Sequence, residues 1–391
     1  GTVRRSFEPA GDAVRAAFGP SSTFLRTPGP SFAGAATHRA DPFYRDPAAG
    51  IRETYWTQTP RGQVTRYQHP IPGDDDLSRA RALPVTVIAG VEDGPTLLLI
   101  AGEHGNEYEN IVALQETLTA LDPNVLKGRV VGIHCCSVDS YLNRTRVAQA
   151  DGYNLARVYP GKENGTLSER IAYTLQNDFL GQPAPHKPIC LVALHTFGPG
   201  MMGATLSGYN IYPAAPELTA AQRAFSLATG LPLVWGHEFD PAHAATAEIG
   251  DDASGRTALY AAYLAAIPAT YWETTWGGSG VEEYKRGLHR LIVHCNMLEG
   301  NNEPIAPRAL IESVGAHGAG NMASHHKAPL QGLWRPEVAI WDKVREGDLL
   351  GTLRDLYGDT RIEIRASRDG TLIGMPRMQY VVEGMPCGIV V

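Results

Sequence analysis

Apolar strands that alternate with amphipathic helices constrain the fold of this chain more than any other feature of its sequence. The runs LPVTVIAG and PTLLLIAG begin at Leu83 and Pro95 and are joined by the turn-like VEDG, so we expect two neighbouring strands. Further strands are predicted at GRVVGIHCCSV and PICLVALHT, with helices at NIVALQETLTALDP and SERIAYTLQNDFLG. Several strands are apolar on both faces, which is typical of a largely parallel sheet covered by helices.

This pattern predicts an α/β fold with a mixed, largely parallel sheet flanked by helices over residues 76–300. Its last helix is expected over VEEYKRGLHRLIVHCNMLEG, ending at Gly300. Residues 1–75 are rich in Pro, Gly, Ser and Ala and predict an irregular N-terminal extension, and residues 301–330 predict a linker. Residues 331–391 contain short alternating strands separated by EGD, DG and EG, which predict a small all-β, barrel-like domain.

Composition excludes several classes of partner. The formal net charge is −7 and no cluster of Lys and Arg interrupts it, so we do not expect nucleic-acid binding. No run of 18 apolar residues is present, so we expect no membrane-spanning segment. The five cysteines are odd in number and form no CxxC pair, which indicates reduced thiols and a cytoplasmic location.

The segment AGEHGNEYEN contains a His104-x-x-Glu107 pair that predicts a metal site. Imidazole nitrogen and carboxylate oxygen suit zinc, although this spacing alone also fits an ordinary capped helix start. Gly102 and Gly105 favour the metal, because they let the backbone turn sharply beside His104. His195 ends an apolar strand, where α/β folds collect ligands. We predict that these two histidines and Glu107 bind one Zn²⁺ per chain and leave a coordination position for water.

Hydrolysis by such a site also needs a proton carrier and groups that stabilise negative charge. Glu273 in ATYWETTWGGSG is the candidate carrier, since apolar surroundings raise a carboxyl pKa; a surface glutamate at a strand end is the alternative. Arg146 and Arg157 in LNRTRVAQADGYNLARVYPG are candidates for binding the oxyanion and a substrate carboxylate. Arg144 is expected to be a solvated loop charge.

The order of these motifs resembles the succinylglutamate desuccinylase/aspartoacylase family, within the zinc carboxypeptidase-like superfamily. GxHGNE, NxxR near DGxNLxRxYPG, LHT and TxxExxxGGxG follow one another from about Leu83, and the C-terminal segment resembles the family's small β-domain. The resemblance implies zinc ligands His104, Glu107 and His195; a general base and later proton donor, Glu273; a carbonyl or oxyanion contact, Arg146; and substrate contacts Arg157, Asn154 and Tyr159.

Two positions depart from the family pattern. Ala156 stands where the family usually has a second Asn that helps the arginine bind a carboxylate, so the substrate could be blocked, larger or differently anchored. Ala193 stands where the family tends to have an acid two residues before the third ligand. Because such acids orient metal ligands, either the metal affinity or the group that orients His195 should differ.

The expected function is a zinc amidohydrolase that deacylates an N-acyl amino acid or a related small amide. A metallocarboxypeptidase acting on short peptides and a non-catalytic metal-binding or carrier protein are the alternatives, although the hairpin RASRDGTLIGMPRMQ has no lysine for a carried group. The sequence leaves the oligomeric state open, with a homo-oligomer as one alternative. A second cluster is expected to be a solvated loop and not another metal site: His237, Glu238, Asp240 and His243.

Overall fold

The computed structural model describes residues 55–391, apart from 74, 251–253, 279, 316–319 and 323–324. All of these residues belong to the second of two units into which the chain divides, Pro47–Val391. Most of the predicted N-terminal extension lies outside the described residues.

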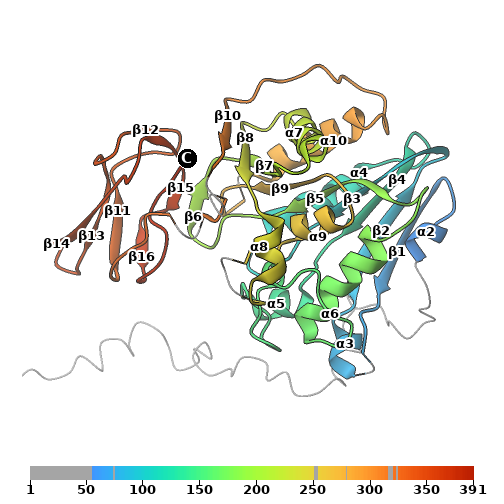
Figure 1. Ribbon diagram of the computed structural model, residues 1–391, viewed down its shortest axis with the longest axis horizontal. Helices are drawn as coiled ribbons and strands as arrows, with labels where there is room; N and C mark the ends of the chain where they lie inside the picture. Colours follow the sequence, from blue (N-terminus) through green and yellow to red (C-terminus); the bar gives the residue numbers. More distant parts are fainter. Residues whose placement is uncertain (1–54, 74, 251–253, 279, 316–319, 323–324) are drawn as a thin grey trace, which may run out of the picture. The chain divides into compact units, whose positions relative to one another are not determined.

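A nine-stranded mixed sheet organises the second unit (Figure 1). The pairs β4–β3, β3–β5, β5–β9, β7–β8 and β8–β10 are parallel, whereas β1–β2, β2–β4 and β9–β7 are antiparallel. The predicted mixed, largely parallel sheet is therefore confirmed. In spatial order the strands are β1 (Gln63–His69), β2 (Leu83–Ala89), β4 (Lys127–Ile133), β3 (Glu92–Ile100), β5 (Pro188–Leu194), β9 (Ala269–Glu273), β7 (Leu206–Ile211), β8 (Leu233–Glu238) and β10 (Ala309–Ser313).

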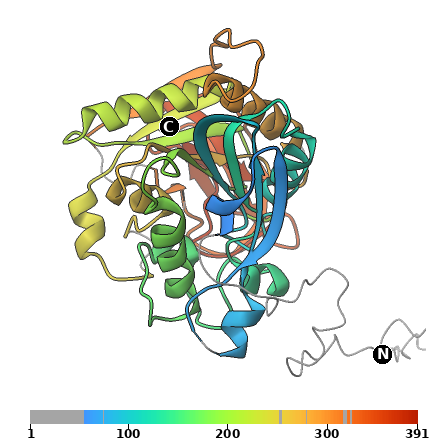
Figure 2. The ribbon, with the colours of Figure 1, turned by 90° about the vertical axis from the view of Figure 1, so that its right-hand side faces the viewer.

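Helices cover both faces of this sheet (Figure 1 and Figure 2). Leu97 and Leu99 of β3 pack with α4 (Glu109–Ala120), α7 (Pro216–Ala228) and α10 (Val281–His294). Leu98 and Ile100 pack on the other face with α6 (Leu167–Thr174), its π-helical continuation (Leu175–Leu180) and α9 (Ala258–Leu264). Because successive strand residues point to opposite faces, a strand buried between two helical layers is apolar throughout, as the sequence of β3 is.

The prediction that β2 and β3 are neighbours is wrong, because β4 lies between them. The connection from β2 to β3 crosses the beginning of β4 at close range. A Cβ on Gly90 would lie 2.0 Å from the carbonyl oxygen of Leu126, and one on Gly94 would lie 2.6 Å from the backbone nitrogen of Gly128. The glycines of this connection therefore permit a close backbone crossing and not a hairpin turn.

Two edge strands lie where irregular chain was expected. β1 and the short helix α2 (Tyr55–Gln58) fall within the predicted extension, and β10 falls within the predicted linker. The short helix α3 (Asp76–Ala80) follows the extension directly. Both strands are largely half-exposed or exposed, so they lack the continuous apolar run that identifies an inner strand. β10 pairs with β8 and closes one edge of the sheet.

The last helix of the body ends earlier than predicted. α10 ends at His294, and Cys295 is its C-cap, whereas the sequence pattern placed the end at Gly300. Asn296 adopts a left-handed conformation with φ of 55°. A residue in this conformation commonly terminates a helix, and Asn tolerates it better than most residues.

The C-terminal segment forms antiparallel β-structure with its own core around Trp334, which confirms the predicted β-segment. One sheet has the order β14-β13-β11-β16; the other contains β12, β15 and β17, and β6 (Met201–Gly203) of the main body pairs with β15. The strands of the segment are β11 (Gly332–Pro336), β12 (Lys343–Val344), β13 (Leu349–Arg354), β14 (Thr360–Arg365), β15 (Gly370–Pro376), β16 (Gln379–Val381) and β17 (Ile389–Val390).

Two expectations from composition can be compared with the structure. Within the described part of the chain, none of the helices has the length and apolar character that crossing a lipid bilayer requires. All five cysteines are buried and free, as expected for reduced thiols.

The crossing at Gly90 predicts a stability effect. We expect Gly90→Ala to lower the free energy of unfolding by about 1–3 kcal/mol, because the added methyl group overlaps the Leu126 backbone. Chemical denaturation measures this change. Gly198→Ala is the matched control, since a Cβ there has no atom within 4 Å, and its effect should stay within about 0.5 kcal/mol. Equal stabilities of the two variants would contradict the account of the crossing.

Candidate metal centre and active site

Three adjacent parallel strands carry the candidate site at their carboxyl ends. The loop between β3 and α4 holds His104 and Glu107, His195 follows β5 directly, and Glu273 is the last residue of β9. Because β3, β5 and β9 are neighbours in the sheet, side chains that are distant in the sequence meet at one edge.

Two glycines shape the loop that holds His104. Gly102 has φ of 65°, which is the left-handed region that favours glycine. A Cβ on Gly105 would lie 1.9 Å from the carbonyl carbon of Ser140, so only glycine fits there. The prediction that these glycines permit a tight turn next to His104 agrees with this geometry.

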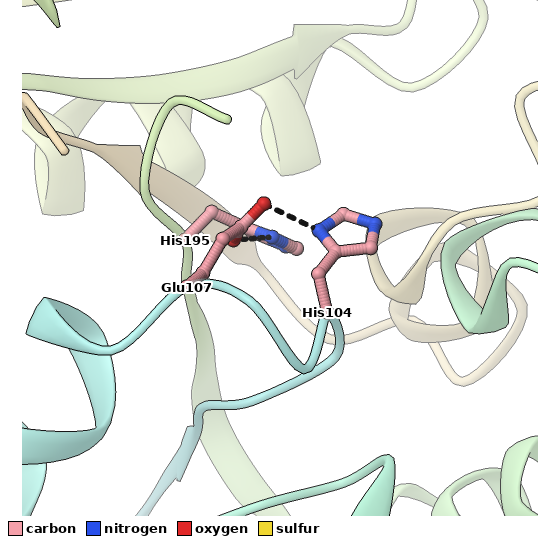
Figure 3. A group of neighbouring side chains, drawn as sticks. All are labelled: His104, Glu107 and His195. Carbon is pink, nitrogen blue, oxygen red and sulfur yellow. Dashed lines mark hydrogen bonds and ion pairs between the residues drawn. The ribbon is translucent and has the colours of Figure 1, made fainter. Parts of the chain in front are cut away.

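The buried side chains of His104, Glu107 and His195 converge on one point. One possible metal-ligand atom from each of the three lies within 4.8 Å of those of the other two. Glu107 Oε1 is 2.7 Å from His104 Nδ1, and Glu107 Oε2 is 3.3 Å from His195 Nδ1 (Figure 3). Oε2 also accepts a hydrogen bond from the Thr196 backbone N–H at 3.0 Å. The structure thus brings together the three side chains that the sequence singled out.

The hydrogen bonds of His104 show that this group fits a cation. Its Nε2 is 3.0 Å from Asn154 Oδ1, which also accepts the Ala156 backbone N–H at 3.0 Å, so Nε2 must donate. Burial, and then the charge of Arg146, lower the pKa of His104 and favour the neutral ring. The lone pair of Nδ1 then faces Glu107 Oε1 at 2.7 Å. The electron pairs of His104 Nδ1 and Glu107 Oε1 repel each other at this distance, so a cation bound by both atoms would stabilise them. Two imidazoles with one carboxylate suit Zn²⁺.

Glu103, which no sequence pattern singled out, orients the third candidate ligand. Its Oε2 is 2.9 Å from His195 Nε2, and its Oε1 accepts a hydrogen bond of 2.7 Å from the Tyr159 hydroxyl. Burial alone would lower the pKa of His195, but hydrogen bonds to Glu103 and Glu107 outweigh it and raise that pKa well above its usual range. Glu103 thus does what an acid at position 193 would do. Its place directly before His104 was the available signal.

Asn154 and Tyr159 lie behind the ligands and not in a substrate-facing position. Asn154 bonds His104 and caps the short 3-10 helix Leu155–Arg157, and the fully buried Tyr159 bonds Glu103. Neither residue lines the cavity. Sequence spacing places both near the site but does not show which way their side chains point; in the structure they contact His104 and Glu103.

A cavity of about 180 Å³ opens beside the candidate ligands. Arg146, Arg157 and Glu273 line it, as do His104 and His195. Ala156 and Ala193 line the same cavity, so a small apolar side chain faces it at each of these two positions.

The charged groups of the cavity have distinct surroundings. Burial, and then the negative charge of Glu107, raise the pKa of Glu273 to about 8, although His195 and Arg146 oppose this. Arg146 Nη1 is 3.2 Å from Glu107 Oε1, and its side chain is 48% exposed. Arg157 Nη1 donates to the Ala156 carbonyl at 2.8 Å. The cavity is therefore lined by a carboxyl that can exchange a proton near neutral pH and by two guanidinium groups.

The second histidine cluster belongs partly to this cavity. His237, at the end of β8, lines it, whereas Asp240 caps α8 (Pro241–Thr246) by accepting the Ala242 N–H at 2.9 Å. Among the residues that the structure describes, the metal-type cluster of His, Cys, Asp and Glu is the one around Glu107. The segment expected to be a solvated loop is thus partly helical.

The contact between Glu103 and His195 predicts an effect on metal affinity. We expect Glu103→Gln to weaken binding of Zn²⁺ about 10–100-fold, because His195 loses the carboxylate that orients its ring. Competition with a chromogenic chelator measures the affinity. The control is Glu299→Gln at an exposed position after α10, which should bind Zn²⁺ as the parent does. An unchanged affinity in Glu103→Gln would overturn this role.

The raised pKa of Glu273 predicts a pH dependence of stability in chelator-treated protein. A carboxyl whose folded-state pKa is raised stabilises the fold below its ordinary value and loses that contribution as pH rises through the folded-state pKa. Relative to Glu273→Gln, the unfolding free energy of the parent should therefore fall as pH rises from about 4.5 to about 8. Denaturant titrations across this range measure the difference between the two proteins. A difference that does not vary with pH would contradict the assignment.

Comparisons with known proteins agree with this fold. A family model described as the succinylglutamate desuccinylase/aspartoacylase catalytic domain matches residues 93–253. The chain is 28% identical over 313 residues to N-alpha-acetyl-L-2,4-diaminobutyric acid deacetylase of Halomonas elongata, covering 78% of this chain and 83% of that protein.

Solved structures show the same architecture. A succinylglutamate desuccinylase from a Silicibacter species superposes with a TM-score of 0.70 at 22% identity, covering 85% of this chain and 96% of that one. The product-bound ectoine utilization protein EutE (DoeB) of Ruegeria pomeroyi gives 0.68 at 22% identity, with the same two coverages of 85% and 96%. At these identities the likeness shows the fold. The matched family model and the relative support the resemblance to the succinylglutamate desuccinylase/aspartoacylase family.

Proposed function

We propose that this protein is a zinc-dependent amidohydrolase that removes the acyl group from an N-acyl amino acid or a related small amide. The observation that carries the proposal is the position of Glu273, a buried carboxyl with a raised pKa, on the same cavity as His104, His195 and two arginines. The Halomonas relative, whose name describes the deacetylation of an N-acetylated amino acid, supports this reaction class.

His104, Glu107 and His195 would hold the zinc ion, with Asn154 and Glu103 orienting the two imidazoles. When bound, a zinc ion in such a site polarises the carbonyl of the scissile amide and lowers the pKa of water. Two histidines and one carboxylate leave a coordination position open, which is typical of catalytic and not of structural zinc sites.

Glu273 would move protons at the reacting centre. Its carboxylate takes a proton from the attacking water and later gives it to the leaving amine. A carboxyl whose pKa lies near neutrality suits both steps, because it can accept and release a proton at the same pH. Binding of a cation next to it would lower that pKa from its metal-free value, which favours the base form at the start of the reaction.

The two arginines would bind negative charge on the substrate. Arg146 lies beside the candidate ligands and is half-exposed, so its guanidinium can turn from Glu107 towards the developing oxyanion. Arg157 also lines the cavity and would bind a carboxylate of the substrate. Since Ala156 offers no amide to help, Arg157 would be the main anchor for that carboxylate.

The role of Glu273 predicts the result of a kinetic experiment. We expect Glu273→Gln to lower kcat about 10²–10⁴-fold, because the proton carrier is lost, while zinc content stays unchanged. The measurement uses zinc-loaded protein with a panel of N-acetyl, N-succinyl and N-aroyl amino acids, their amides and short peptides, with and without chelator.

The matched control for this experiment is Glu282→Gln at an exposed position of α10, which should keep the full rate. Full activity of zinc-loaded Glu273→Gln would refute the proton-transfer role. Hydrolysis of short peptides in preference to N-acyl amino acids would favour a carboxypeptidase instead.

A further inference from the structure

The loop that follows Glu273 is bonded to the loop that carries the candidate metal ligands. The indole Nε1–H of Trp276 donates to the carbonyl of Asn106 at 3.1 Å. The backbone N–H groups of Gly277 and Gly278 both donate to Glu109 Oε1, at 2.6 and 2.5 Å. Glu109 is the first residue of α4, two positions after Glu107, so its carboxylate joins the two halves of the site.

The backbone at Gly277 and Gly278 is shaped for this contact. Their φ angles are 106° and 95°, which residues other than glycine rarely adopt. Consecutive N–H groups that converge in this way form a small anion-binding concavity. Glu109 is buried, and its other oxygen has no hydrogen-bond partner among the described residues. A buried carboxylate is costly, and here two charge-assisted bonds to one oxygen offset that cost.

The outer side of the same loop is held by the rest of the fold. Thr275 Oγ1 donates to the Gly203 carbonyl at 2.8 Å and accepts the Gly203 N–H at 3.0 Å. Arg377, which follows β15, donates to the Trp276 carbonyl at 3.1 Å. The loop is therefore fixed between the C-terminal β-segment on one side and the ligand-carrying loop on the other, and Glu109 makes the charged contact on the ligand side.

We propose that Glu109 is a positioning residue that sets the distance between the metal ligands and Glu273. This inference rests on the proposed role of Glu273 as proton carrier. A general base must lie within hydrogen-bond reach of the water that it deprotonates, and a misplacement of about 1 Å costs on the order of 100-fold in rate. Glu109 acts through the loop, without touching the reacting atoms.

Three substitutions separate reach from charge at this position. Glu109→Gln keeps an acceptor oxygen at the same reach without charge, Glu109→Asp keeps the charge but shortens the side chain, and Glu109→Ala removes both. If the contact between Glu109 and the glycine amides positions the loop after Glu273, kcat falls about 100-fold in Glu109→Ala and Glu109→Asp and less than 10-fold in Glu109→Gln. KM and zinc content stay unchanged in all three variants. The matched control is Glu116→Ala on the exposed side of the same helix, where the ion pair with Lys285 contributes little.

A second readout is independent of activity and of the role of Glu273. Hydrogen exchange of the Gly277 and Gly278 amides in zinc-loaded protein should be at least about 10-fold faster in Glu109→Ala and Glu109→Asp than in the parent, in Glu109→Gln and in Glu116→Ala. Equal exchange rates in all variants would overturn the proposal. A higher activity of Glu109→Asp than of Glu109→Gln would also overturn it. If exchange responds as expected but Glu273→Gln is fully active, the proton-transfer role fails while the contact itself stands.

Discussion

The candidate site depends on the contacts of the Glu107 carboxylate with the imidazoles of His104 and His195. All three side chains are buried, and a buried carboxylate is destabilising unless positive charge and hydrogen bonds surround it. The ring of His104 is held with its donor towards Asn154, so an electron pair faces Glu107. The electron pair of His104 Nδ1 and the Glu107 carboxylate repel each other, and a divalent cation between them would remove this repulsion. This is the physical reason for assigning a candidate metal to the site.

The parallel centre of the sheet makes this convergence possible. β3, β5 and β9 are adjacent, and each ends at a residue or loop of the site. Around them, Glu103 with Tyr159 and Asn154 with Ala156 fix the ring orientations of the two histidines. The three candidate ligands are therefore held by backbone and buried hydrogen bonds without a metal, which would limit the reorganisation that metal binding requires.

Sequence patterns predicted the parts of the molecule that local chemistry determines. The apolar inner strands were predicted, and the three candidate ligands and Glu273 were singled out, because each has a period or motif of its own. The position of β4 between β2 and β3 was not predicted, since it depends on a long-range crossing at Gly90. β1 and β10 were missed because edge strands lack an apolar run. The inward direction of Tyr159 and the role of Glu103 depend on tertiary contacts that spacing does not encode.

Metal analysis of the purified protein tests the central claim most directly. Protein reconstituted with Zn²⁺ and freed of excess metal should contain close to one zinc ion per chain, and His104→Ala, Glu107→Ala and His195→Ala should each lose most of it while remaining folded. His243→Ala, on α8, provides the control and should retain the metal. Stoichiometric zinc in His195→Ala, or none in the parent protein, would contradict the account.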